Sequence, residues 1–107
     1  MDSNTYSTEE PGFAALTAAV QELATQDLSG LTDAVRAERV LILRRLLDRL
    51  EGQWLQELAA VDARGAAGAD HDLPAGSTAG WLRARLHMGA SAAHHSVRTA
   101  RALFGGP

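Results

Sequence analysis

The sequence predicts an all-α fold. Hydrophobic residues make up 46% of the 107 residues but aromatic residues only 5%, so the apolar content is mostly Ala, Leu and Val. Ala and Leu favour helices, and apolar residues recur at three- and four-residue steps, as on one face of a helix. We expect about four helices: a long central helix packed by an N-terminal helix and by a C-terminal helix-turn-helix-like hairpin.

The N-terminal part predicts a tail followed by one helix. Residues 1–10 are polar and acidic without periodicity, and we expect them to form a disordered tail. Pro11 suits the first turn of a helix, and Ser29 and Gly30 interrupt a helix. We therefore expect a helix over about 11–26, with its apolar face formed by Phe13, Leu16, Val20 and Leu23.

The central segment predicts the longest helix, over about 33–64, with Thr32 as its N-cap. Such a helix is about 45 Å long, so part of it must extend past the core or be covered by another chain or by further sequence. Leu41 and Leu55 lie off the main apolar stripe and predict a second partner surface. The stripe consists of Val40, Leu43, Leu46, Leu47, Leu50, Trp54, Leu58 and Val61.

The C-terminal part predicts a loop and then two short helices. Residues 65–76 contain three Gly and one Pro, which is typical of a loop. Ser77 is placed to cap a helix over about 77–87, and a turn at 88–90 leads to a last helix over about 91–104, with Ser91 in a cap-like position. We expect residues 11–107 to form a single helical domain.

The composition excludes several classes of site. The chain has no cysteine, so it forms neither disulfides nor thiolate metal sites. No apolar run reaches the length of a membrane span, and residues 1–10 lack the pattern of a secretory signal. We expect a cytoplasmic protein with no membrane partner. The histidines match no metal-ligand spacing, and no nucleophile or carboxylate pair predicts catalysis. We therefore expect no metal, no cofactor, no small-molecule substrate and no enzymatic activity.

Charge is distributed unevenly along the chain. Residues 1–72 carry all thirteen acids and six of the ten arginines, for a net charge of −7. The remaining residues carry four arginines and no acid, for a net charge of +4. Such asymmetry indicates an anionic partner.

The two C-terminal helices resemble a helix-turn-helix motif. In the last helix His94, Arg98 and Arg101 share a face, from which they would reach phosphates or base edges of duplex DNA together. The candidate DNA-binding residues are Arg83, Arg85, His94, Arg98 and Arg101. The alternative is a solvated basic face on an ordinary helical hairpin.

Three segments resemble the actinobacterial 13E12-repeat family (domain of unknown function 222). They are LLDRLEGQWLQELAAVDARG at 46–65, GSTAGWLRARL at 76–86 and RTARALF at 98–104, and the likeness covers about 40–107. In that family a helical domain usually precedes an HNH nuclease module. Members continue past the position of Pro107, so the resemblance implies a fragment of a longer domain or a truncated gene product. An HNH module needs paired His ligands and an Asn, and the single Asn here is Asn4; the resemblance thus implies nuclease activity for longer relatives only.

Two functional hypotheses follow. In the first, the chain is a DNA-binding accessory domain that neutralises phosphates through its arginine-bearing hairpin. In the second, it is a helical interaction or oligomerisation module that binds no nucleic acid, or a non-functional remnant. Its candidate interface residues are Leu41 and Leu55, and its partner is a second copy or the remainder of the family domain.

Overall fold

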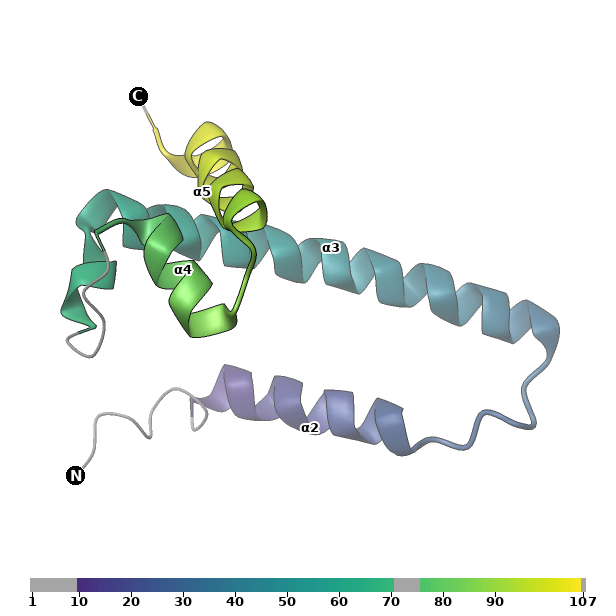
Figure 1. Ribbon diagram of the computed structural model, residues 1–107. Coiled ribbons are helices and arrows are strands. Elements are labelled where there is room, and N and C mark those ends of the chain that lie inside the picture. Colours follow the sequence, from purple (N-terminus) through teal and green to yellow (C-terminus); the bar gives the residue numbers. More distant parts are fainter. Residues whose placement is uncertain (1–9, 71–75, 107) are drawn as a thin grey trace. The chain divides into compact units, whose positions relative to one another are not determined.

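The computed structural model describes residues 10–70 and 76–106, and within them the chain has four α-helices and no strand. The all-α prediction is therefore confirmed. The predicted tail up to residue 9, and His71 and Asp72 in the predicted loop, lie outside the described residues. The helices are α2 (Pro11–Thr25), α3 (Asp33–Arg64), α4 (Thr78–Leu86) and α5 (Ala90–Phe104), with a short 3-10 turn, η2 (Ala66–Ala69), after α3 (Figure 1).

The chain divides into two compact units, one ending at Glu38 and the other beginning at Arg39. In the first unit α2 starts at Pro11, as the sequence predicts, and none of its residues is buried. The N–H and hydroxyl of Ser29 both donate to Asp27 Oδ1, at 3.0 and 2.7 Å, and these bonds lower the pKa of Asp27. The N–H of Val35 donates to Thr32 Oγ1 at 3.2 Å, so Thr32 caps α3.

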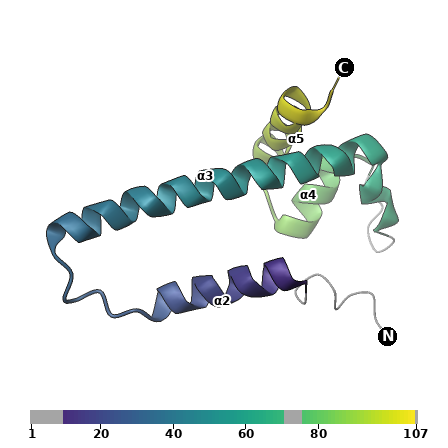
Figure 2. The ribbon, with the colours of Figure 1, turned by 180° about the vertical axis from the view of Figure 1, so that it is seen from behind.

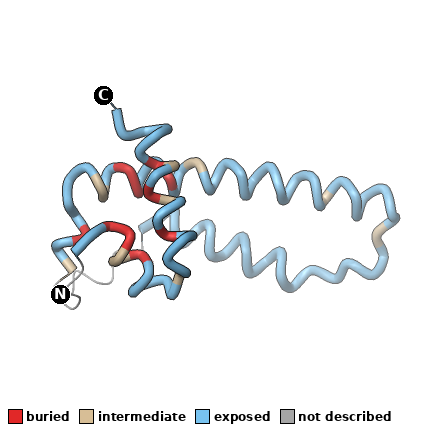
Figure 3. Tube along the Cα trace, turned by 45° about the horizontal axis from the view of Figure 1, so that its top comes forward, coloured by how far each residue is buried: buried red, intermediate tan, exposed pale blue. Residues whose placement is uncertain are grey.

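Helix α3 is unbroken over 32 residues, or about 48 Å (Figure 2). Its buried residues are confined to its C-terminal part, where Leu55, Leu58 and Ala59 lie. Figure 3 shows the rest of this helix as exposed or only partly covered. The helix ends where Gly65 takes the left-handed conformation (φ 63°, ψ 28°), which costs glycine nothing.

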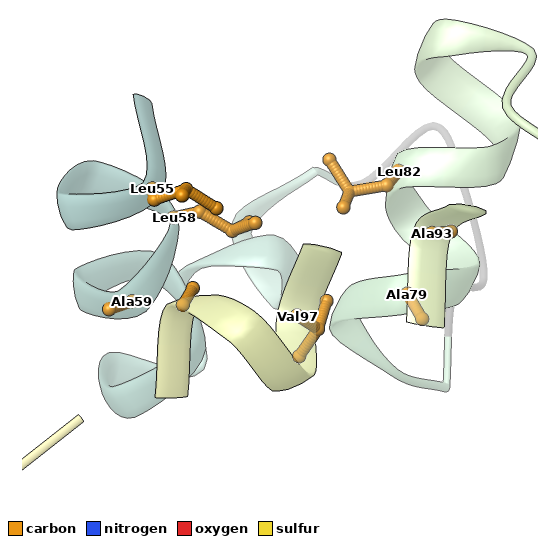
Figure 4. Close-up of a cluster of buried hydrophobic side chains, with 8 residues drawn as sticks. Leu55, Leu58, Ala59, Ala79, Leu82, Ala93 and Val97 are labelled. Carbon is orange, nitrogen blue, oxygen red and sulfur yellow. The ribbon is translucent and has the colours of Figure 1, made fainter. Parts of the chain in front are cut away.

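The core of the second unit lies where α4 and α5 pack on the end of α3 (Figure 4). Ala93 and Ala100 of α5 are completely buried, and such small side chains let helices approach closely. Trp81 and Met88 pack against the cluster and are partly buried. The cluster consists of Leu55, Leu58, Ala59, Ala79, Leu82, Ala93, Val97 and Ala100.

Local interactions set the limits of α4 and α5. The N–H of Gly80 donates to Ser77 Oγ at 3.0 Å, so Ser77 caps α4 as predicted. Helix α4 ends at His87, whose φ of 57° and ψ of 33° are left-handed. Gly89 precedes α5 without a side-chain cap, so Ser91 lies inside the helix and the predicted capping role for it is wrong.

Candidate interaction surfaces

The most conspicuous surface of the second unit is an apolar seam on α3, formed by Val40, Leu43, Leu47, Leu50 and Trp54. Their exposed fractions run from 37% for Trp54 to 64% for Val40. Monomeric proteins rarely expose contiguous apolar patches of this kind, and such patches mark interaction sites. The stripe was predicted from the sequence, but the structure shows that its N-terminal part is not covered by the core.

The spacing of the seam is that of a coiled-coil helix. Its residues follow one another at steps of three, four, three and four positions, which is the a and d pattern of a heptad repeat. At these positions the side chains of one helix insert between those of a facing helix. The seam therefore has the form of a surface that packs against a second helix.

The predicted interface residues lie in different environments. Leu41 is half exposed, as expected. Leu55 is only 7% exposed and belongs to the core, so its assignment to an exposed surface is wrong. The physical reason is that α4 and α5 pack on the face of α3 that carries Leu55, Leu58 and Ala59, and not on the centre of the longer stripe.

A groove of about 290 Å³ continues the surface beyond Trp54, between α3 and α4. Its walls are mainly apolar, and Glu57 and Arg85 add charge. The apolar lining comes from Trp54, Leu58, Val61, Trp81, Leu82 and Leu86. Both tryptophans line this groove, and Trp81 also packs against the core cluster. Trp54 is exposed, and the partly buried Trp81 donates from Nε1 to Asp70 Oδ2 at 3.0 Å.

Two of the five candidate DNA-binding residues are engaged within the chain. Arg85 forms a bidentate ion pair with Asp70, whose side chain is mostly buried. Arg101 forms a second one with Asp62, through Nε to Oδ2 at 2.6 Å and Nη2 to Oδ1 at 3.0 Å. Arg83, His94 and Arg98 are exposed. The predicted basic face is therefore smaller than the arginine count suggests.

Asp62 ties the three helices of the second unit together. It lies on α3, accepts from Arg101 on α5, and accepts from the hydroxyl of the buried Thr78 on α4 at 2.8 Å. The bond from Arg101 lowers the pKa of Asp62, a lesser effect of Thr78 acts the same way, and desolvation opposes both. The same pair raises the pKa of Arg101. The roles of Asp62, Asp70 and Thr78 could not be predicted from the sequence, because no local motif links residues so far apart in the chain.

Two further findings concern metal sites and membrane spans. Across residues 10–70 and 76–106, His, Asp and Glu side chains form no group of three that could hold a metal ion. None of the helices in these ranges is both long and apolar enough to cross a bilayer.

Comparison with known proteins identifies no relative of the chain. No protein-family description, curated protein or solved structure matches the chain. The likeness to the 13E12-repeat family stays a prediction from the sequence, and functional inference depends on the surfaces of the chain itself.

Proposed function

We propose that this chain is a non-catalytic helical association module that forms a homo-oligomer through the seam of α3. The observation that supports this is the seam itself, five large apolar side chains in heptad spacing, each more than a third exposed. Covering apolar surface favours association because it removes that surface from water. A second copy suits this surface, because a heptad seam needs a facing helix with the same spacing, and another α3 supplies one.

Sedimentation equilibrium of the full chain over a range of concentrations tests the proposal. We expect the mass to rise with concentration, and we expect a variant with Leu43→Asp and Leu50→Asp to stay monomeric. Both positions are exposed, so circular dichroism should show the same helix content. Ile42→Asp is the matched control, because Ile42 is equally exposed but lies on another side of the helix. A wild-type chain that is monomeric throughout, or a seam variant that associates like the wild type, would overturn the proposal.

A second candidate function is binding of duplex DNA, and one observation favours it. Residues 76–106 contain four arginines and no acid, and Arg83 on α4 and Arg98 on α5 are exposed. Phosphate neutralisation by such side chains binds DNA without sequence preference. The resemblance to a domain that precedes HNH nucleases supports the same candidate.

Titration of duplex DNA at two salt concentrations tests this candidate. Replacing Arg83 and Arg98 with Ala should weaken binding and lower the salt dependence by about two phosphate contacts. Arg49→Ala on α3 is the control and should leave binding unchanged. A wild-type chain that does not bind DNA at low salt excludes this candidate and leaves the association proposal untouched.

A further inference from the structure

Charge along α3 changes sign within the second unit. From residue 39 to 50 the helix carries four arginines and one aspartate, for a net charge of +3. From 51 to 64 it carries three acids and one arginine, for a net charge of −2. A parallel pair of these helices would set like charges side by side, whereas an antiparallel pair sets the basic half of each against the acidic half of the other.

We propose that two copies pair antiparallel along the seam, about a two-fold axis near Asp48. The inference rests on the association proposed above and names the segment that each seam meets. Positions equally distant from the axis on its two sides then face each other across the interface. Leu47 faces the partner's Leu50, and Leu43 faces the partner's Trp54.

The charged residues beside the seam fit this register. Glu57 follows Trp54 at the next three-residue step, so in this register it faces the partner's Val40 and lies next to the partner's Arg39. Arg44 and Glu51 lie about two turns apart along one edge of the seam. An antiparallel two-fold brings identical edges together and places Arg44 beside the partner's Glu51. Arg44 now pairs with Asp48 at 2.8 Å, but both side chains are more than half exposed, so an exchange of partners costs little.

The shape of the surface favours the same arrangement. The groove beside Trp54 lies at the acidic end of the seam, and Glu57 is part of its lining. Val40 and Leu43, at the basic end, are exposed apolar side chains. In the antiparallel register these side chains face the partner's groove, whereas a parallel pair would set groove against groove.

Cysteine cross-linking tests the direction of pairing, because the chain has no cysteine of its own. We would prepare Leu43→Cys and Trp54→Cys chains of different mass and oxidise them separately and mixed. The antiparallel register predicts a disulfide between the two variants in the mixture and no disulfide-linked dimer when each variant is oxidised alone, because a disulfide needs Cα atoms within about 7 Å. A parallel dimer would give the reverse result.

Charge reversal is a second measurement that leaves the seam intact. Arg44→Glu or Glu51→Arg alone should weaken the dimer about fivefold, because each creates two like-charge contacts at exposed positions. The double variant should restore the wild-type dissociation constant. Arg45→Glu makes the same charge change away from the seam and is the control.

The outcomes separate this inference from the proposed function. Cross-linking of Leu43→Cys chains with themselves, or failure of the double charge variant to recover, overturns the antiparallel register while seam-dependent association stands. A chain that is monomeric in sedimentation overturns both proposals.

Discussion

The turn between α4 and α5 depends on a histidine in a conformation that favours glycine. His87 has a φ of 57°, where Cβ crowds the backbone of an L-residue. The turn of a helix-turn-helix often contains glycine, and this chain has His87 directly after Leu86. The structure shows that His87 adopts the backbone conformation that such a glycine would supply.

His87→Gly should therefore leave the free energy of unfolding unchanged or raise it by up to about 1 kcal/mol. His87→Val should lower it by about 1 to 2 kcal/mol, because a β-branched residue tolerates positive φ poorly. Urea unfolding followed by circular dichroism measures both. Equal stability of the two variants would show that the turn does not hold this conformation in solution.

Loss of the Asp62 side chain should weaken the packing of all three helices of the second unit, because Asp62 links them. Asp62→Ala removes the acceptor of the buried Thr78 hydroxyl. We expect a loss of about 1 to 2 kcal/mol in the free energy of unfolding, because a buried donor is left without an acceptor. Asp48→Ala, which removes only an exposed ion pair, should change it by less than about 0.5 kcal/mol.

The pH dependence of this effect has a definite sign. The folded chain holds the pKa of Asp62 below its ordinary value of 3.8, so the unfolded chain binds the proton more readily. The stabilisation is complete above that value and is lost as the pH falls through the lower folded pKa. The stability difference between wild type and Asp62→Ala should therefore shrink when urea unfolding is repeated below about pH 4. A difference that stays constant there would contradict the ion pair.

At the scale of elements, the limits of the helices could be predicted because their signals are local. Pro11, the Thr32 cap and the Ser77 cap act on neighbouring residues, and the observed helices start and end within one residue of the predicted ones. Which face of α3 is buried could not be predicted. Leu55 and Leu50 are both leucines on one helix, and only the docking of α4 and α5 decides that Leu55 is covered.

The candidate surfaces, like the helices, could be predicted only where the signal in the sequence is local. The sequence identified the apolar stripe and the arginines, because composition and periodicity show them directly. It did not show that Asp70 and Asp62 engage Arg85 and Arg101, since these pairs are 15 and 39 residues apart. Charge counts along a sequence therefore overstated the basic surface of the hairpin.

Helix α4 contributes the most enclosed leucine of the core. Leu82 is 3% exposed, and Leu82→Ala should lower the free energy of unfolding by about 2 to 5 kcal/mol through lost burial and the cavity left behind. Leu103→Ala, at an exposed position of α5, should have an effect below about 0.5 kcal/mol. Thermal and urea unfolding give both values, and similar losses for the two variants would contradict the described core.

At the scale of the whole molecule, the chain combines a small core with much exposed apolar surface. The described residues include no large side chain that is completely buried. A domain with so few buried side chains has little stability to spare, because burial must offset the entropy of ordering the chain. Association would then contribute to folding as well as to function, and we expect the unfolding midpoint to rise with protein concentration.

One consequence of this distribution concerns motion within α3. Its C-terminal part, from residue 55 onward, packs against α4 and α5. None of residues 39–50 is buried. In dilute solution amide hydrogens of 39–50 should therefore exchange with deuterium faster than those of 55–64, because local opening is easier where few contacts are lost. Raising the concentration should slow exchange in the first segment, and hydrogen-exchange mass spectrometry can follow that change. Uniform exchange along the helix at every protein concentration would mean that residues 39–50 stay helical without a second copy.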